Sequence, residues 1–119
     1  MSPTDASRSS ADVKRHLANW QDEIDSVALY EALAELEEDP RLADVYRRLA
    51  AAESRHAGFW EDKLRAAGAR VPERRPGWRT RLLIAVARRF GTQLVLPTIN
   101  DLERRDSHGY DAQPESRGT

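Results

Sequence analysis

Glu53 and His56 are the residues of this sequence whose types and spacing indicate chemistry most directly. They stand three positions apart, so on a helix their side chains share one face about one turn apart. A carboxylate and an imidazole in that arrangement can bind the same metal ion. The pair also lies within an apolar stripe between Leu49 and Trp60, where an ionised carboxylate without a partner is costly to bury. We therefore expect a metal ion to neutralise it.

Glu23 is the carboxylate that we expect to join this pair. It falls on the inward face of a preceding helical pattern together with Trp20 and Tyr30, and an antiparallel hairpin would bring it opposite Glu53. In helical-bundle di-iron centres, two helices each provide one Glu and two others each provide a Glu-x-x-His pair. The hairpin thus predicts one half of such a ligand set. The alternative is that Glu23 and Glu53 lie at the margins of the apolar stripes, in solvent.

A short internal repeat indicates Glu103 as a further ligand. The segments Glu23 to Tyr30 and Glu103 to Tyr110 both begin with Glu and end with Tyr seven residues later, and both contain Asp-Ser, one position later in the second segment. If the repeat is structural, Glu103 faces the same metals as Glu23, and Tyr110 packs as Tyr30 does. His108 stands five positions after Glu103, about 140° around a helix, so it does not make a second Glu-x-x-His pair.

The composition limits which donors a metal site can use. The 119 residues include three histidines and no cysteine, which excludes disulfides, thiolate nucleophiles and cysteine-bound metals. Carboxylate and imidazole donors favour hard or borderline metals. The predicted half-set of a di-iron centre makes iron the expected cofactor, with manganese or zinc as alternatives. The accessory candidates are an entry carboxylate, Glu31, and two phenols that hydrogen-bond ligands or relay electrons, Tyr30 and Tyr110. The plainer interpretations are an exposed acid, two packing tyrosines and, at His16, a surface histidine.

The positions of Gly and Pro divide the chain into helices. Apolar residues recur at three- and four-residue spacing, without Gly or Pro, over residues 12–38. Asp39-Pro40 is a typical N-cap and first residue for a second helix, which should end at Gly68. The second apolar stripe comprises Leu42, Val45, Leu49, Ala52, His56, Phe59 or Trp60, and Leu64. The predicted elements are a disordered tail (1–10), helices at 11–38 and 40–67, a linker (69–77), helices at 78–90 and 92–110, and a polar tail (112–119).

This organisation predicts an all-α fold in one domain, residues 11–111. Two long helices of similar length joined by a short turn form an antiparallel hairpin, and the chain is long enough for one modest core. The further helices extend the hairpin towards a bundle that dimerisation completes. No run of about 20 apolar residues is present, and the polar first ten residues lack the apolar core of a signal peptide. We therefore expect a cytoplasmic protein.

Arginines are concentrated in one segment, although the net charge is only -1. Residues 70–89 contain seven arginines and one acid, Glu73, and the helix predicted from Trp78 to Phe90 is amphipathic. Such a segment suits phospholipid head groups, nucleic acid or an acidic neighbour, or it is a solvated face. No recognisable reading motif accompanies it, so a nucleic-acid partner is not expected. The rival function is a metal-free interaction module that docks on a membrane surface or a partner protein through this helix.

The chain resembles the ferritin-like superfamily, specifically rubrerythrin-type domains, over roughly residues 11–115. The resemblance is greatest to the soluble N-terminal domain of membrane-bound ferritins in the vacuolar iron transporter family. The residues that carry it are Glu23 followed by Tyr30, Glu53 with His56 thirty residues after the first Glu, and the arginine-rich segment leading into Leu96-Pro97 and Glu103 to Tyr110.

The resemblance implies a four-helix bundle with a di-iron centre that oxidises Fe(II) with oxygen or peroxide, a ferroxidase-type activity. It also implies iron handling for storage, detoxification or an attached membrane transporter, with the domain at the membrane face. The chain departs from the family pattern because it contains no second Glu-x-x-His pair. A second copy related by a two-fold axis would supply the missing ligands by symmetry, so a homodimer with iron at its interface is the expected assembly.

Overall fold

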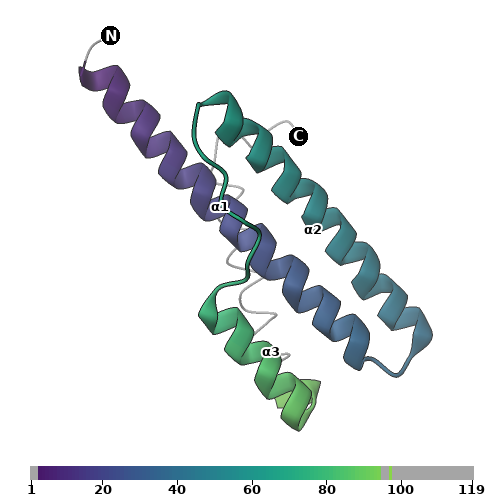
Figure 1. Ribbon diagram of the computed structural model, residues 1–119. Helices are drawn as coiled ribbons and strands as arrows, with labels where there is room; N and C mark the ends of the chain where they lie inside the picture. The colour runs from purple at the N-terminus through teal and green to yellow at the C-terminus, as the bar shows by residue number, and fades with distance from the viewer. Residues whose placement is uncertain (1–2, 95–96, 98–119) are drawn as a thin grey trace.

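Every element that the structure describes is helical. The computed structural model describes residues 3–94 and Pro97, which form helices α1 (Pro3–Leu36), α2 (Pro40–Ala66) and α3 (Trp78–Phe90) and a short 3-10 turn, η1 (Thr92–Leu94) (Figure 1). No strand occurs among these residues. The prediction of an all-α fold is therefore confirmed. None of the described helices combines the length and apolar character needed to cross a bilayer.

The packing of α1 against α2 forms the main core. The two helices run antiparallel side by side, and residues 37–39 join them (Figure 1). Their contact is centred on Trp20 and Ile24 of α1 and on Trp60 and Leu64 of α2, none of them more than 4% exposed. Full burial of such side chains stabilises the fold by about 1.5 to 3 kcal/mol each. This core fixes which residues of the two helices lie opposite one another.

The face of α2 that contacts α1 differs from the predicted apolar stripe. Three alanines at seven-residue spacing are buried: Ala43, Ala50 and Ala57. Four large side chains of the predicted stripe are instead exposed: Leu42, Val45, Leu49 and Phe59. Small side chains let two helix backbones approach closely, so the alanine face is the one that packs against α1. The expectation that the large apolar residues face the hairpin is therefore wrong for Leu42, Val45 and Leu49. Where the sequence allows Phe59 or Trp60, Trp60 is the buried residue.

Both ends of α2 are as predicted. The Asp39 side chain accepts a hydrogen bond from the Arg41 backbone N–H at 3.0 Å, and Pro40 occupies the first turn, where its missing N–H leaves no bond unmade. Gly68 follows the C-cap with a φ of +75°, which residues with a side chain rarely adopt. The N-cap and the glycine therefore define the length of this helix.

The N-terminal helix begins earlier than expected. The sequence predicts a disordered tail over residues 1–10 and a helix from residue 11, whereas α1 begins at Pro3. Proline is tolerated in a first helical turn, and residues 4–10 contain neither Gly nor Pro to interrupt the helix. The polar composition of this stretch therefore did not predict its backbone conformation.

The third helix lies beside the C-terminal half of α1 (Figure 1). Ala87 joins Leu29 and Leu33 in a second core cluster, against which Leu83 and Ile84 pack. The linker predicted at 69–77 contains no helix, and the helix predicted at 78–90 has the observed bounds. Most of the helix predicted at 92–110 and the polar tail at 112–119 lie outside the described residues.

Asp25 of α1 fixes the start of α3. Its Oδ1 accepts hydrogen bonds from the Gly77 backbone N–H at 2.8 Å and from Gln21 Nε2 at 3.0 Å. Gln21 Nε2 also donates to the Arg75 carbonyl oxygen at 3.0 Å. Gly77 is the N-cap of α3 and has no side chain to cap it, so a carboxylate from another helix provides the negative charge that a helix N-terminus favours.

Replacing Asp25 with Ala should loosen α3 without unfolding the hairpin. We expect a loss of about 1 kcal/mol in the free energy of unfolding, the usual contribution of an N-cap. Amide hydrogen exchange should also accelerate at Arg81, whose N–H bonds to the Gly77 carbonyl oxygen. Asp62→Ala, which removes an exposed acid of α2, is the control and should change neither quantity. Unchanged exchange at Arg81 in Asp25→Ala would show that the cap does not hold α3.

Candidate metal centre

Glu23, Glu53 and His56 come together where α1 and α2 pack. One ligand atom from each lies within 4.8 Å of the other two. His56 Nδ1 is 3.6 Å from Glu23 Oε2 and 3.5 Å from Glu53 Oε1. The hairpin register supplies Glu23, and the three-residue spacing on α2 supplies the other two. These are the three residues whose side chains the sequence predicts to meet in one metal site.

The separations suit donors that share one cation. Metal–ligand bonds of about 2.0 to 2.2 Å with angles between about 90° and 109° place neighbouring donors about 2.8 to 3.6 Å apart. The two distances to His56 Nδ1, 3.5 and 3.6 Å, are close to this range. They are too long for strong charge-assisted hydrogen bonds, which are typically about 2.7 to 2.9 Å. The donor set of two carboxylates and one imidazole therefore fits a metal ion.

The exposed fractions of the three side chains increase from the core to the surface. The side chain of Glu23 is 2% exposed, that of Glu53 21% and that of His56 57%. Glu23 belongs to the same buried face of α1 as Trp20 and Ile24. Taking a carboxylate out of water is unfavourable unless positive charge or hydrogen bonds compensate it. The cluster therefore extends from the surface at His56 to the core at Glu23.

The accessory candidates lie elsewhere. Glu31 is exposed and lines a groove of about 420 Å³ between α1 and α3 together with Arg81 and Arg88. Tyr30 is half-buried, and its ring stacks on Tyr46 with centroids 6.4 Å apart, in the second core cluster. Packing therefore accounts for the position of Tyr30. Two further predicted residues, Glu103 and Tyr110, lie outside the described residues.

Two titratable groups on α1 near this region have shifted pKa values. Desolvation lowers the pKa of His16, and the charges of Arg15 and Lys63 add to the shift. The His16 ring lies against Trp60 with centroids 5.3 Å apart, so it is a packing residue rather than the surface histidine that the sequence predicts. Desolvation also raises the pKa of Asp22 to about 6, with repulsion by Asp25 adding to it.

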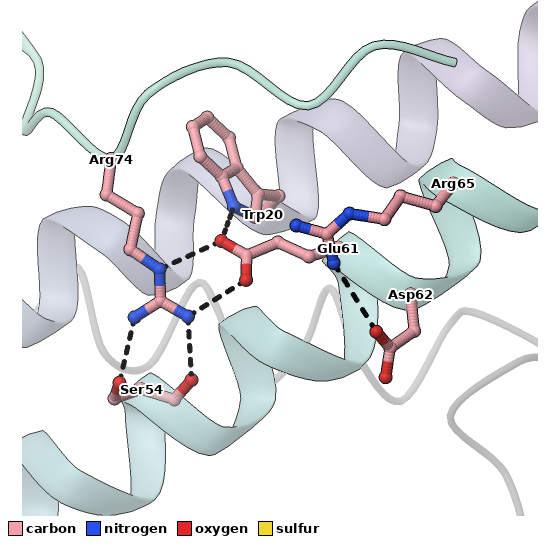
Figure 2. Close-up of polar contacts among 6 residues, drawn as sticks. All are labelled: Trp20, Ser54, Glu61, Asp62, Arg65 and Arg74. Carbon is pink, nitrogen blue, oxygen red and sulfur yellow. Dashed lines mark hydrogen bonds and ion pairs between the residues drawn. The ribbon is translucent and has the colours of Figure 1, made fainter. Parts of the chain in front are cut away.

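Arg74 clamps the linker onto the ligand-bearing turn of α2 (Figure 2). Its guanidinium donates to Ser54, through Nη1 to the hydroxyl oxygen at 2.8 Å and through Nη2 to the backbone oxygen at 3.3 Å. Nε and Nη2 also donate to the two carboxylate oxygens of Glu61, at 2.8 and 3.0 Å. Ser54 lies between Glu53 and His56 in the sequence. The clamp therefore supports the turn that presents Glu53 and His56.

Glu61 is the centre of this clamp, and sequence reasoning missed it. Its Oε2 accepts hydrogen bonds from Trp20 Nε1 at 2.9 Å and from Arg74, so the carboxylate joins α1, α2 and the linker (Figure 2). The sequence groups Arg74 with the other arginines of a basic segment and does not pair it. A buried indole N–H needs an acceptor, and that need is the one signal in the sequence that pointed towards a carboxylate on α2 near Trp20.

Comparisons with known proteins place this chain in no family. A scan against protein-family models, a search of curated proteins and a search of solved structures found no match to the chain. The resemblance to ferritin-like domains therefore stays a prediction from the sequence.

Replacing Glu61 with Gln should remove a pH-dependent part of the stability. The hydrogen bonds from Arg74, opposed by desolvation and aided by the bond from Trp20, hold the pKa of Glu61 below its ordinary value of 4.5. A carboxyl with a lower pKa in the folded chain stabilises it above about pH 4.5, and this contribution disappears as the pH falls through the folded pKa. Urea unfolding at pH 7 should show a loss of about 1 to 3 kcal/mol in Glu61→Gln.

The loss of unfolding free energy in Glu61→Gln should shrink as the pH is lowered from 4.5 to 3. Asp62→Asn is the matched control, because Asp62 pairs with Arg65 in an exposed ion pair, which is worth less than about 1 kcal/mol. Parallel stability curves for Glu61→Gln and the wild-type chain over this pH range would contradict the assignment.

Proposed function

We propose that this chain binds iron through Glu23, Glu53 and His56 and, as a homodimer, forms a di-iron carboxylate centre that oxidises Fe(II). The observation that carries the proposal is the convergence of these three side chains, one of them a buried carboxylate. Carboxylate and imidazole donors suit iron, and manganese and zinc suit the same donors. Iron is the choice that the family resemblance favours.

The dimer follows from the number of ligands. Di-iron centres in helical bundles take four carboxylates and two imidazoles from four helices. The described residues bring together two carboxylates and one imidazole, which is half of that set. A two-fold axis beside His56 would double it, because an isologous interface repeats every residue of one copy on the other.

The exposed apolar side of α2 supports this assembly. Leu42, Val45, Leu49 and Phe59 are large apolar side chains in solvent, and His56 lies on the same side of the helix. A row of apolar residues with no cover in the described chain is typical of a protein interface. A second copy would cover this row and at the same time exclude water from the metal ligands.

The protein residues would favour oxidation through their charge. Two carboxylates stabilise Fe(III) more than Fe(II), so they lower the free energy of the product relative to the substrate. Each Fe(II) substrate gives one electron to oxygen or peroxide. Glu23, held in the core, would fix one iron, and His56, at the surface of the single chain, would add an imidazole ligand beside the two-fold axis. The resemblance further suggests a membrane transporter as the partner that exchanges iron with this domain.

Removing ligands should abolish iron binding. Glu53→Gln with His56→Gln should weaken Fe(II) binding more than about 100-fold in anaerobic calorimetry, because loss of an outer-shell partner alone costs about 10- to 100-fold. Oxidation-dependent absorbance after adding oxygen should disappear as well. Without metal, this double variant should stay folded, because Glu53→Gln removes a negative charge next to the buried carboxylate of Glu23.

Glu31→Gln with His16→Gln is the matched control, because it changes one Glu and one His outside the cluster. It should bind Fe(II) like the wild-type chain. If the wild-type chain binds no Fe(II), Mn(II) or Zn(II), or if the Glu53 and His56 variant binds as the control does, the site assignment fails.

Assembly should depend on both the metal and the apolar side of α2. In sedimentation velocity, the wild-type chain with Fe(II) should be a dimer, and chelation should shift it towards monomer, since metal binding and association are linked. Val45→Asp should be monomeric under both conditions. Ala51→Asp places the same charge on an exposed position of α2 away from this side and should dimerise normally. A wild-type chain that stays monomeric with bound iron would argue against a shared centre.

A further inference from the structure

The outward face of α3 is apolar, and no part of the chain that the structure describes covers it. Trp78 and Phe90 are each 63% exposed and Leu82 is 57% exposed, although all three are large apolar side chains. The inward face is already occupied, because Thr80 and Ala87 are buried and Leu83 packs against α1. The helix therefore has an apolar surface beyond the one that holds it to the hairpin.

Arginines surround this outward face. The helix carries Arg79, Arg81, Arg88 and Arg89 and no acidic residue. The Arg79 guanidinium lies 5.2 Å from the centre of the Trp78 ring, and that of Arg89 lies 5.2 Å from the centre of the Phe90 ring. Arg88 points the other way and pairs with Glu35 of α1 at 3.1 Å. Each end of the helix thus presents an aromatic ring with a cation beside it.

This combination matches the interface of an anionic bilayer. Helices that lie in a membrane surface place Trp, Phe and Leu at the boundary of the acyl chains and Arg at the phosphates. Arginine side chains extend along apolar surface while the charged head stays in the polar layer. A purely apolar protein groove would leave these cations without partners, whereas a layer of phosphates offers one to each.

Single-stranded nucleic acid fits less well. Such binding uses aromatic rings on which successive bases stack. Trp78 and Phe90 stand twelve residues apart, which is about 18 Å along a helix. That separation is too large for neighbouring bases.

We propose that α3 docks this protein on the surface of an anionic lipid bilayer. Trp78, Leu82 and Phe90 enter the interfacial layer, and Arg79 and Arg89 bind lipid phosphates. The inner face of α3 and the Asp25 cap hold the helix to α1, so docking also fixes the orientation of the hairpin. The proposal goes beyond the metal site and does not depend on it.

Vesicle flotation tests the proposal directly. The full chain, kept in chelator so that no metal bridges protein and lipid, is mixed with vesicles of phosphatidylcholine alone or with added phosphatidylserine. We expect flotation only with the anionic vesicles, and less of it at high salt. Trp78 is the exposed tryptophan, whereas Trp20 and Trp60 are buried, so a blue shift of the fluorescence should report entry of α3 into the bilayer.

Two variants with a matched control locate the contact. Arg79→Gln with Arg89→Gln should weaken binding to anionic vesicles about 20- to 30-fold, since each arginine near the surface contributes about five-fold. Trp78→Ser with Phe90→Ser should abolish the blue shift and most of the flotation. Arg47→Gln with Arg48→Gln removes the same charge from α2 and should bind nearly as the wild-type chain does. Circular dichroism confirms that each variant is folded.

Several results would overturn the proposal. Equal binding to neutral and anionic vesicles would remove the role of the arginines, and equal weakening by the α2 control would remove that of α3. A blue shift that appears without vesicles as protein concentration rises would make this face a contact between copies. A wild-type chain that binds single-stranded DNA but no vesicles would make it a nucleic-acid surface. Because metal is absent from every sample, none of these results bears on iron binding.

Discussion

The antiparallel packing of α1 on α2 is the constraint on which the rest of this structure depends. Two tryptophans, Trp20 and Trp60, fill its centre, and three alanines of α2 let the helices come close. The same packing carries Glu23 into the core and leaves it facing Glu53 and His56. A carboxylate is unfavourable in such a position unless something compensates its charge. The core thus places a buried carboxylate beside an imidazole, His56.

Polar contacts, together with the second apolar cluster around Ala87, hold the remaining chain to this hairpin. Arg74 joins the linker to Glu61 and Ser54, and Asp25 caps α3 through Gly77. Both contacts join residues far apart in the chain. Arg74 binds residues of α2, and Gly77 binds Asp25 of α1. They give the linker a defined course and so determine where α3 lies. A short helix can keep a fixed orientation when such polar contacts add to its apolar packing on α1.

Two apolar surfaces of the described chain remain uncovered, and they differ in chemistry. The side of α2 that includes Leu49 surrounds a histidine and has acidic neighbours, which suits a second copy sharing a cation. The outward face of α3 has arginines beside Trp78 and Phe90, which suits phosphates. The charges around each surface, and not its apolar area, distinguish the two kinds of partner.

The sequence by itself determined the described helices, both ends of α2 and the spacing of Glu53 and His56, but not the start of α1. N-caps, glycines and three-residue spacing act within one or two turns, so Asp39, Gly68 and the Glu53 to His56 pair were predictable from local rules. Only the tertiary structure decided which apolar face of α2 turns inward, that Glu61 binds Arg74 and Trp20, and that Asp25 caps α3. These depend on the rotation of one helix against another and on contacts between residues far apart in the chain. Periodicity gives the apolar faces of a helix but not the choice between two adjacent ones, because that choice follows from how closely the backbones can pack.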